Sequence, residues 1–279
     1  MNPSAAHVQR QLQRVPFDAC PLCGGGTATE IVKVGCTDHP LYHPMLSSQI
    51  SWLACDRCDH VFTDGYFADR DLEVVFSRGH ANQLPSATAG RAQLADDRAV
   101  AARIIDKVAA VRGLPSGRWL DVGAGAGALL ATAREYGYDV LGLDRRRAVV
   151  DGLCALGFDV RACDLTDLPE TGFAVISFAD VLEHMPFPRD ALREAHRRLA
   201  EHGTLFVSMP DRESFLWSRL DAAGTNPYWS ELEHVHNFGR RGLYRLLREE
   251  GFEPIRHGIS ERYVACMEVV AVRQPRQVP

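Results

Sequence analysis

The stretch LDVGAGAGA, residues 120–128, decides the fold of this 279-residue chain. It follows a short apolar run at Trp119–Val122 and precedes a helical pattern over Ala128–Tyr136. Glycines at a strand-to-helix turn let the backbone bend sharply and let a ligand approach the main chain closely. The stretch therefore predicts a ligand-binding loop at the start of an α/β domain.

Apolar runs and helical patterns alternate on both sides of this loop. The runs that predict strands are Trp119–Val122, Val140–Leu143, Phe158–Val160, Phe173–Phe178 and Thr204–Ser208. The helical patterns between them are Ala128–Tyr136, Arg146–Leu156 and Ala191–Ala200, and a further helix is expected at Leu94–Val111. Alternation of this kind predicts a mostly parallel sheet with helices on both faces.

The end of the chain departs from that alternation. A predicted helix at Arg240–Glu250 is closed by Gly251, and two strands are expected at Phe252–His257 and Tyr263–Val272. The few residues between these strands are too few for a crossover helix, so the two strands should be antiparallel.

Two classes of ligand fit the glycine loop taken alone. Gly123, Gly125 and Ala128 satisfy the dinucleotide pattern GxGxxG/A, and Asp144 lies at a suitable distance for a ribose-binding acid. Asp121, two residues before the first glycine, suits a cationic or hydrogen-bond-donating ligand better than a pyrophosphate. The antiparallel end of the predicted sheet also disfavours a dinucleotide-binding fold.

The loop and three later motifs resemble those of class I S-adenosylmethionine (SAM)-dependent methyltransferases. DVGAGAG at 121–127 is similar to the family's first motif, (D/E)xGxGxG. LGLD at 141–144, CDL at 163–165 and the strand ending in LEH at 182–184 are similar to the next three, in the same order. The resemblance covers roughly Arg112 to Arg273.

This resemblance implies a Rossmann-like sheet of about seven strands, mostly parallel, with the last strand antiparallel. It also implies SAM as the cofactor, held by Asp121, Gly123 and Gly125. Asp144 would accept hydrogen bonds from the ribose hydroxyls, and Asp164 would meet the adenine amino group.

Cys20-Pro-Leu-Cys23 and Cys55-Asp-Arg-Cys58 form two CxxC pairs. In a reducing compartment such pairs are better metal ligands than disulfide partners, and four thiolates complete a structural zinc site. A redox role is disfavoured because no βαβ pattern surrounds either pair. His60 is a weaker candidate for a substitute ligand.

The cysteine pairs resemble the N-terminal zinc module of bacterial nucleotide-sugar C-methyltransferases and related natural-product enzymes, in which the module helps to frame the substrate pocket. We expect a flexible tail at 1–16, a zinc-ribbon-like module at 17–85 and a linking helix at 86–112. The methyltransferase domain should then span 113–279, with a lid inserted at 210–239 after the fifth strand.

Histidines are the candidates for removing a proton from the methyl acceptor. His234 is the first choice, with Glu233 to orient it, because the sugar C-methyltransferases carry Tyr-x-Glu-His at a similar place. Glu231 stands where that tyrosine would be, so the sequence departs from the family pattern. His184, after the fourth strand, is the second choice.

The net charge of -5 argues against a nucleic-acid substrate, and no apolar run is long enough to cross a bilayer. Residues 1–14 lack the apolar stretch of a secretory signal, so a cytoplasmic enzyme is expected. Its substrate should be a small polar metabolite, such as a sugar or natural-product intermediate. Two alternatives are an RNA or protein methyltransferase that recognises its substrate through the zinc module, and a catalytically silent SAM-binding partner subunit.

Overall fold

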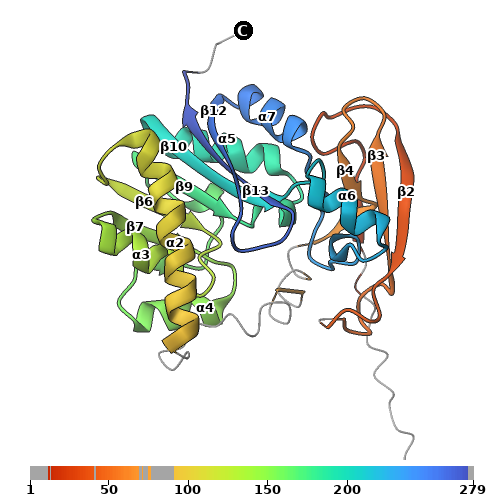
Figure 1. Ribbon diagram of the computed structural model, residues 1–279, viewed down its shortest axis with the longest axis horizontal. Helices are drawn as coiled ribbons and strands as arrows, with labels where there is room; N and C mark the ends of the chain where they lie inside the picture. Colours follow the sequence, from red (N-terminus) through yellow and green to blue (C-terminus); the bar gives the residue numbers. More distant parts are fainter. Residues whose placement is uncertain are drawn as a thin grey trace, which may run out of the picture.

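The computed structural model describes residues 12, 14–40, 42–68, 71, 75–76 and 91–275. Its main sheet has seven strands in the order β12-β13-β10-β9-β6-β7-β8 (Figure 1). These strands are β6 (Arg118–Val122), β7 (Asp139–Leu143), β8 (Val160–Arg161), β9 (Phe173–Ala179), β10 (Leu199–Pro210), β12 (Phe252–Ile259) and β13 (Cys266–Arg273).

The five strands from β6 to β10 are parallel, whereas β13 is antiparallel to both of its neighbours, β10 and β12. The predicted Rossmann-like sheet with an antiparallel end is therefore confirmed. Some strand boundaries differ from the predicted ones, because the apolar run in the sequence does not coincide with the residues that pair in the sheet. The third strand lies at Val160–Arg161 instead of Phe158–Val160, and the last begins at Cys266 instead of Tyr263.

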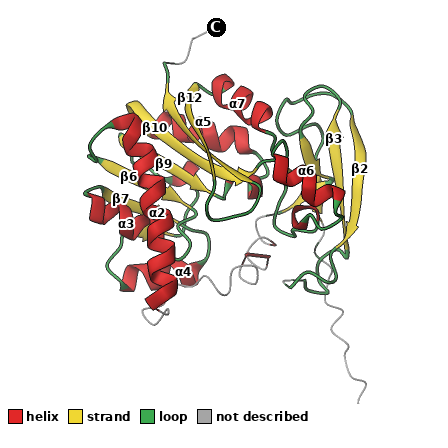
Figure 2. Cartoon of the chain, viewed as in Figure 1, coloured by secondary structure: helices red, strands yellow, loops and turns green. Residues whose placement is uncertain are grey.

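Helices cover both faces of this sheet (Figure 2). One face packs against α2 (Arg91–Arg112), α3 (Ala128–Tyr136) and α4 (Arg147–Ala155). The opposite face packs against α5 (Pro188–Arg198) and α7 (Arg240–Glu249). The central strands are buried on both sides, as parallel strands between two helical layers must be.

A second, four-stranded antiparallel sheet belongs to the N-terminal part of the chain. It contains β2 (Ala28–Gly35), β3 (Gln49–Cys55), β4 (Val61–Thr63) and β11 (His236–Asn237) in the order β11-β4-β3-β2. Trp52 is fully buried in its core. The edge strand β11 comes from the far end of the chain, so the small sheet is completed by the methyltransferase part.

The predicted N-terminal tail was wrong at its end. Residues 14–16 form β1 (Arg14–Pro16), which pairs antiparallel with β5 (Gly65–Phe67). Three residues are too few to show periodicity, and their partner lies some fifty positions away. Residues 1–11 and 13 of the predicted tail, and 86–90 of the predicted linking segment, lie outside the described residues.

The segment expected to form a lid contains α6 (Phe215–Ala222) and a 3₁₀ turn, η4 (Pro227–Trp229). Trp217 stacks on Tyr228 with ring centroids 5.2 Å apart, and Trp229 packs edge-on against Trp52 of the small sheet at 5.7 Å. These aromatic residues therefore join the inserted segment to the N-terminal module.

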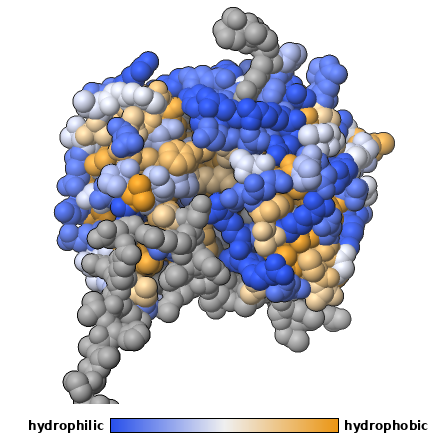
Figure 3. All heavy atoms as spheres, turned by 180° about the vertical axis from the view of Figure 1, so that it is seen from behind, coloured by the Kyte–Doolittle hydropathy of each residue, from blue (hydrophilic) through white to orange (hydrophobic). Residues whose placement is uncertain are grey.

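Among the described helices, none combines the length and the hydrophobicity needed to span a bilayer. On the side drawn in Figure 3, hydrophobic residues occur as small patches among hydrophilic ones.

Candidate functional site

The residues selected from the sequence as SAM ligands lie at the carboxyl ends of parallel strands. The glycine loop follows β6, and Asp144 follows β7. The next strand of the sheet, β9, pairs with β6 and is followed by Asp180 and the LEH turn. In open α/β sheets, ligands bind at this edge.

The amides of the glycine loop are used within the protein. Gly123 N and Ala124 N both donate to Leu143 O, at 2.8 and 2.9 Å, and Gly125 N donates to a carboxylate oxygen of Asp144 at 3.0 Å. A loop that cradles a pyrophosphate directs such amides toward the ligand instead. The hydrogen bonding therefore favours a ligand that is not held by its phosphates.

Two glycines of the loop are required for different reasons. Gly123 has a φ of 78°, and a Cβ there would lie 2.6 Å from Val181 Cγ2. Gly125, with a φ of 55°, has no atom nearer than 3.8 Å to the corresponding position. Gly123 is thus fixed by protein packing, whereas the space at Gly125 is available to a ligand.

Asp144 is buried and is held firmly in place. One of its carboxylate oxygens accepts from Arg146 N at 2.9 Å, and the Arg146 side chain donates to both oxygens. Asp164, by contrast, has a side chain that is 43% exposed, and it forms a bidentate ion pair with Arg145 at 2.7 and 2.8 Å. The two acids expected to bind ribose and adenine therefore differ strongly in their surroundings.

Asp121 is the most deeply buried of the predicted SAM ligands, with 2 % of its surface exposed. It accepts a hydrogen bond of 2.6 Å from Ser177 Oγ, which in turn accepts from Trp119 Nε1 at 2.8 Å. Burial raises the pKa of Asp121 to about 7, although the Ser177 hydroxyl acts in the opposite direction. A cationic group nearby would favour the carboxylate.

The two candidate catalytic histidines lie together. His184 ends the turn η3 (Leu182–His184) after β9, and its ring centroid is 4.8 Å from that of His234. Val235, the neighbour of His234, donates its N–H to Glu183 O at 2.8 Å and accepts from Thr63 N at 2.9 Å. The backbone beside His234 is thus held between the LEH turn and strand β4 of the N-terminal module.

Glu233 is buried, and its backbone carbonyl accepts a hydrogen bond of 3.1 Å from His184 Nδ1. Glu231 lies 3.5 Å from His39 Nε2, an ion pair that reaches from the inserted segment to the N-terminal module. Burial alone would raise the pKa of Glu231, but His39 and His234 hold that pKa down at about 2. Glu231 and His39 are site residues that were not selected from the sequence.

Asp180, Glu183 and Arg262 were also not selected, although the first two belong to the motif around LEH. Asp180 has a φ of 57°, accepts from Ser208 Oγ at 2.9 Å and pairs with Arg262 at 3.3 Å. Glu183 is 1 % exposed, and burial together with the charge of Asp180 raises its pKa well above the ordinary value. The position of Asp180 and Glu183 just after the buried strand β9 was the available signal in the sequence, whereas Arg262 had none.

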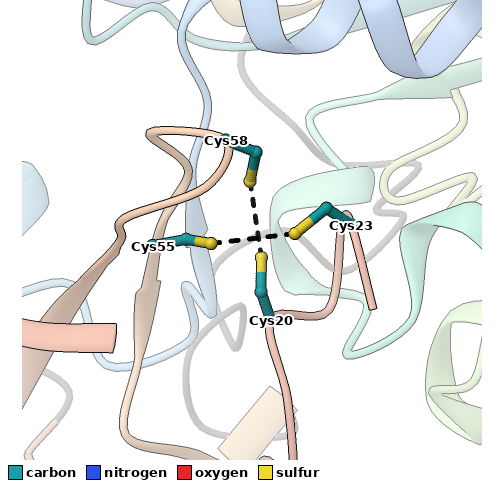
Figure 4. Close-up of side chains that lie close together, drawn as sticks. All are labelled: Cys20, Cys23, Cys55 and Cys58. Carbon is teal, nitrogen blue, oxygen red and sulfur yellow. Dashed lines mark hydrogen bonds between the residues drawn. The ribbon is translucent and has the colours of Figure 1, made fainter. Parts of the chain in front are cut away.

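The four cysteines of the two CxxC pairs point toward one another (Figure 4). The Sγ atoms of Cys20 and Cys58 are 3.6 Å apart, and those of Cys23 and Cys55 are 3.7 Å apart. Ligands at about 2.3 Å from a tetrahedral zinc ion lie about 3.8 Å from one another. All four sulfur atoms lie within 4.8 Å of one another, so the arrangement is compatible with a single metal ion such as zinc.

His60, the weaker candidate ligand, is used elsewhere. Its Nε2 is 3.0 Å from Nδ1 of His236, so it joins the module to strand β11. Two arginines hold the CxxC turns against the helices of the larger domain. Arg189 donates twice to Leu22 O, at 3.0 and 2.6 Å, and Arg245 donates to Cys58 O at 3.0 Å.

Comparisons with known proteins agree with this geometry. Residues 94–257 match the family described as "Methyltransferase domain". A curated relative, the ubiquinone biosynthesis O-methyltransferase of Alkalilimnicola ehrlichii, is 32% identical over 121 residues. That alignment covers 39% of this chain and 49% of the relative, so the match spans about half the length of the relative.

Two solved structures share the fold at low sequence identity. Magnesium protoporphyrin IX methyltransferase from Synechocystis PCC 6803, with bound SAH, superposes with a TM-score of 0.58 at 16% identity, covering 74% of this chain and 100% of that one. The 1,6-didemethyltoxoflavin-N1-methyltransferase of Burkholderia thailandensis gives 0.57 at 17% identity, covering 79% and 98%. The chain therefore belongs to the methyltransferase domain family.

Proposed function

We propose that this enzyme transfers a methyl group from SAM to oxygen or carbon of a small polar metabolite, such as a sugar or natural-product intermediate. The observation that carries the proposal is the combination of a glycine loop whose amides are internally bonded with two buried acids, Asp121 and Asp144, at the same edge of the sheet. SAM carries an ammonium group and ribose hydroxyls, which such acids can bind.

SAM, when bound, supplies an activated methyl group on a sulfonium. The chain's own residues then have to orient it: Asp121 faces the ammonium group, Asp144 accepts from the ribose hydroxyls, and Asp164 meets the adenine amino group. Gly123 and Gly125 let the cofactor approach the backbone. The protein's main task in an in-line transfer is to align nucleophile, methyl and sulfur.

The acceptor's proton is handled by the histidine pair, with His234 first and His184 second. His184 follows β9, the neighbour of the strand β6 that leads into the glycine loop, and the ring of His234 packs against that of His184. Glu233 supports the pair by orienting the His184 ring through its backbone carbonyl, and Glu231 adds negative charge beside His234.

The N-terminal module predicted at 17–85 holds a structural zinc on Cys20, Cys23, Cys55 and Cys58, and α2 (Arg91–Arg112), within the linking segment predicted at 86–112, leads into the catalytic domain predicted at 113–279. The module frames the acceptor side of the site. Supporting contacts are the β4–β11 pairing, the bond from Thr63 N to Val235 O and the His39–Glu231 ion pair.

Calorimetry with SAM and with NAD tests the cofactor assignment. We expect SAM to bind and NAD to give no heat, because the loop amides are not directed at a pyrophosphate. Tight binding of NAD without a response to SAM would contradict the proposal. Incubation with methyl-labelled SAM and fractions of a bacterial extract should then identify the fraction that takes up the label.

Gly125→Ala and Gly137→Ala form a matched pair for the same experiment. Both glycines have positive φ, and neither position meets an atom closer than 3.8 Å. Both variants should therefore lose similar stability, about 1–2 kcal/mol, whereas only Gly125→Ala should weaken SAM binding. Equal SAM affinity in the two variants would argue against close approach of SAM at Gly125.

A further inference from the structure

Glu183, His184 and His234 form a group of potential metal ligands separate from the cysteines. One ligand atom from each of the three side chains lies within 4.8 Å of those of the other two. Two of the residues come from the turn after β9, and the third comes from the inserted segment just before β11. Segments fifty residues apart in the sequence thus meet at one point.

The carboxyl group of Glu183 is the first sign that something binds there. Glu183 is 1 % exposed, and its Oε2 atom has no hydrogen-bond partner among the residues that the structure describes. A buried carboxyl oxygen without a hydrogen-bond partner destabilises the fold. A bound cation would remove that cost.

The orientation of His184 is the second sign. Its Nδ1 lies 3.1 Å from the carbonyl oxygen of Glu233, and a carbonyl can only accept a hydrogen bond. The proton of the neutral ring is therefore on Nδ1, which leaves the lone pair on Nε2. Histidines that bind metals commonly donate their other N–H to a carbonyl or carboxylate in this way.

The surrounding charges also suit a cation. Asp180 and Glu231 both act electrostatically on this group, Asp180 on Glu183 and Glu231 on Glu183 and His234. Arg262 and His39 balance part of this negative charge, each through an ion pair with one of these two acids.

We propose that Glu183, His184 and His234 bind a divalent transition-metal ion on the acceptor side of the methyl-transfer site. Two imidazoles and one carboxylate form a donor set that suits Zn²⁺ or Co²⁺ better than Mg²⁺ or Ca²⁺, and three protein ligands leave positions open for a substrate. Ligand atoms within 4.8 Å of one another would have to move closer together for each to reach an ion at about 2.0–2.2 Å.

This inference rests on the proposed function and specifies how the histidine pair handles the acceptor's proton. The ion binds a hydroxyl oxygen of the acceptor and lowers the pKa of that hydroxyl. The O–H bond breaks and its proton passes to solvent. The oxygen then forms a bond to the methyl carbon as the S–CH₃ bond of SAM breaks, which gives the methyl ether and S-adenosylhomocysteine. One proton is released per turnover.

Titration of Co²⁺ into protein that carries one zinc per chain tests the site, because the four thiolates hold that zinc more tightly and the second site is then open to Co²⁺. We expect one equivalent of Co²⁺ to bind, with visible d–d absorption, and Glu183→Gln and His234→Ala each to weaken Co²⁺ at least tenfold. Glu201→Gln and His202→Ala are matched controls, since both residues are exposed near the start of β10, and these variants should bind Co²⁺ like the wild type.

Circular dichroism and SAM affinity serve as folding checks, and His184→Gln replaces any variant that fails them. Failure of the wild type to bind Co²⁺ at millimolar concentration, or unchanged binding in the site variants, would overturn the inference. Methyl transfer that persists after a chelator has removed all metal except the thiolate-bound zinc would overturn it as well. Co²⁺ binding without any SAM turnover would instead refute the proposed function and leave the metal site standing.

Discussion

Replacement of Asp121 by Asn should make the ligand-free protein more stable at alkaline pH. The rise in the pKa of Asp121 from 3.8 to about 7 is caused mainly by burial. At about 1.36 kcal/mol per pKa unit, ionising this group within the fold costs about 4 kcal/mol. An amide that lacks one hydrogen-bond partner costs about 1–3 kcal/mol. The net gain for Asp121→Asn at pH 8.5 should therefore be about 1–3 kcal/mol.

The pH dependence of this gain tests the raised pKa of Asp121 more specifically than the magnitude of the gain does. An acid whose pKa is raised by folding contributes stability that is complete below the pKa of the unfolded chain, near 4, and is lost as pH rises through about 7. The Asp121→Asn variant has no ionisable group at this position, so its stability does not fall with pH in this way. Its free energy of unfolding relative to the wild type should increase by about 2–3 kcal/mol between pH 5 and pH 7 and then level off.

Urea denaturation in zinc-containing buffer, at half-unit steps from pH 5 to pH 8.5, measures the difference. Asp139→Asn is the control, because the Asp139 side chain is 76% exposed at the start of β7 and should give a flat profile. A difference between Asp121→Asn and the wild type that does not change with pH would refute the reasoning. The same variant should bind SAM about 10- to 100-fold more weakly, since an amide cannot form an ion pair with the ammonium group.

Four further predictions concern the other parts of the site. Elemental analysis should find close to one thiolate-bound zinc per chain, and Cys20→Ser should lose it, because three ligands do not complete the tetrahedral shell. Asp144→Ala should weaken SAM by about 1.5–3 kcal/mol in calorimetry, the scale of charge-assisted hydrogen bonds. His234→Ala should lower kcat about 10²–10⁴-fold at nearly unchanged SAM affinity, and full turnover would contradict a role for it. Gly127→Ala should destabilise the fold more than Gly137→Ala in thermal unfolding, because both have positive φ but only the new Cβ at Gly127 meets the Leu153 side chain.

The sequence was sufficient wherever a feature depends on neighbouring residues. The spacing of apolar residues along the sequence indicates which side chains can face a core, so the alternation of strands and helices could be predicted without the structure. Glycine spacing reports where the backbone must adopt positive φ, and the loop at 123–127 does so at all three glycines. The short connection between the last two strands required an antiparallel pair, which the structure contains. The CxxC spacing likewise predicted four thiols that can meet one ion.

Only the tertiary structure brought together residues whose contacts leave no local pattern. Strand β11 completes a sheet whose other strands lie about 170 to 210 residues earlier, and the His39–Glu231 ion pair joins the same two segments. In the sequence, Glu183 is one acidic residue in a turn. The structure shows that one of its carboxyl oxygens is buried without a hydrogen-bond partner among the described residues. The sequence by itself thus determined the fold class and predicted the ligand chemistry of the glycine loop and cysteines, because those follow from backbone geometry over a few residues. The proposed acceptor site depends on packing, because its side chains come from two parts of the chain that meet only when both are folded.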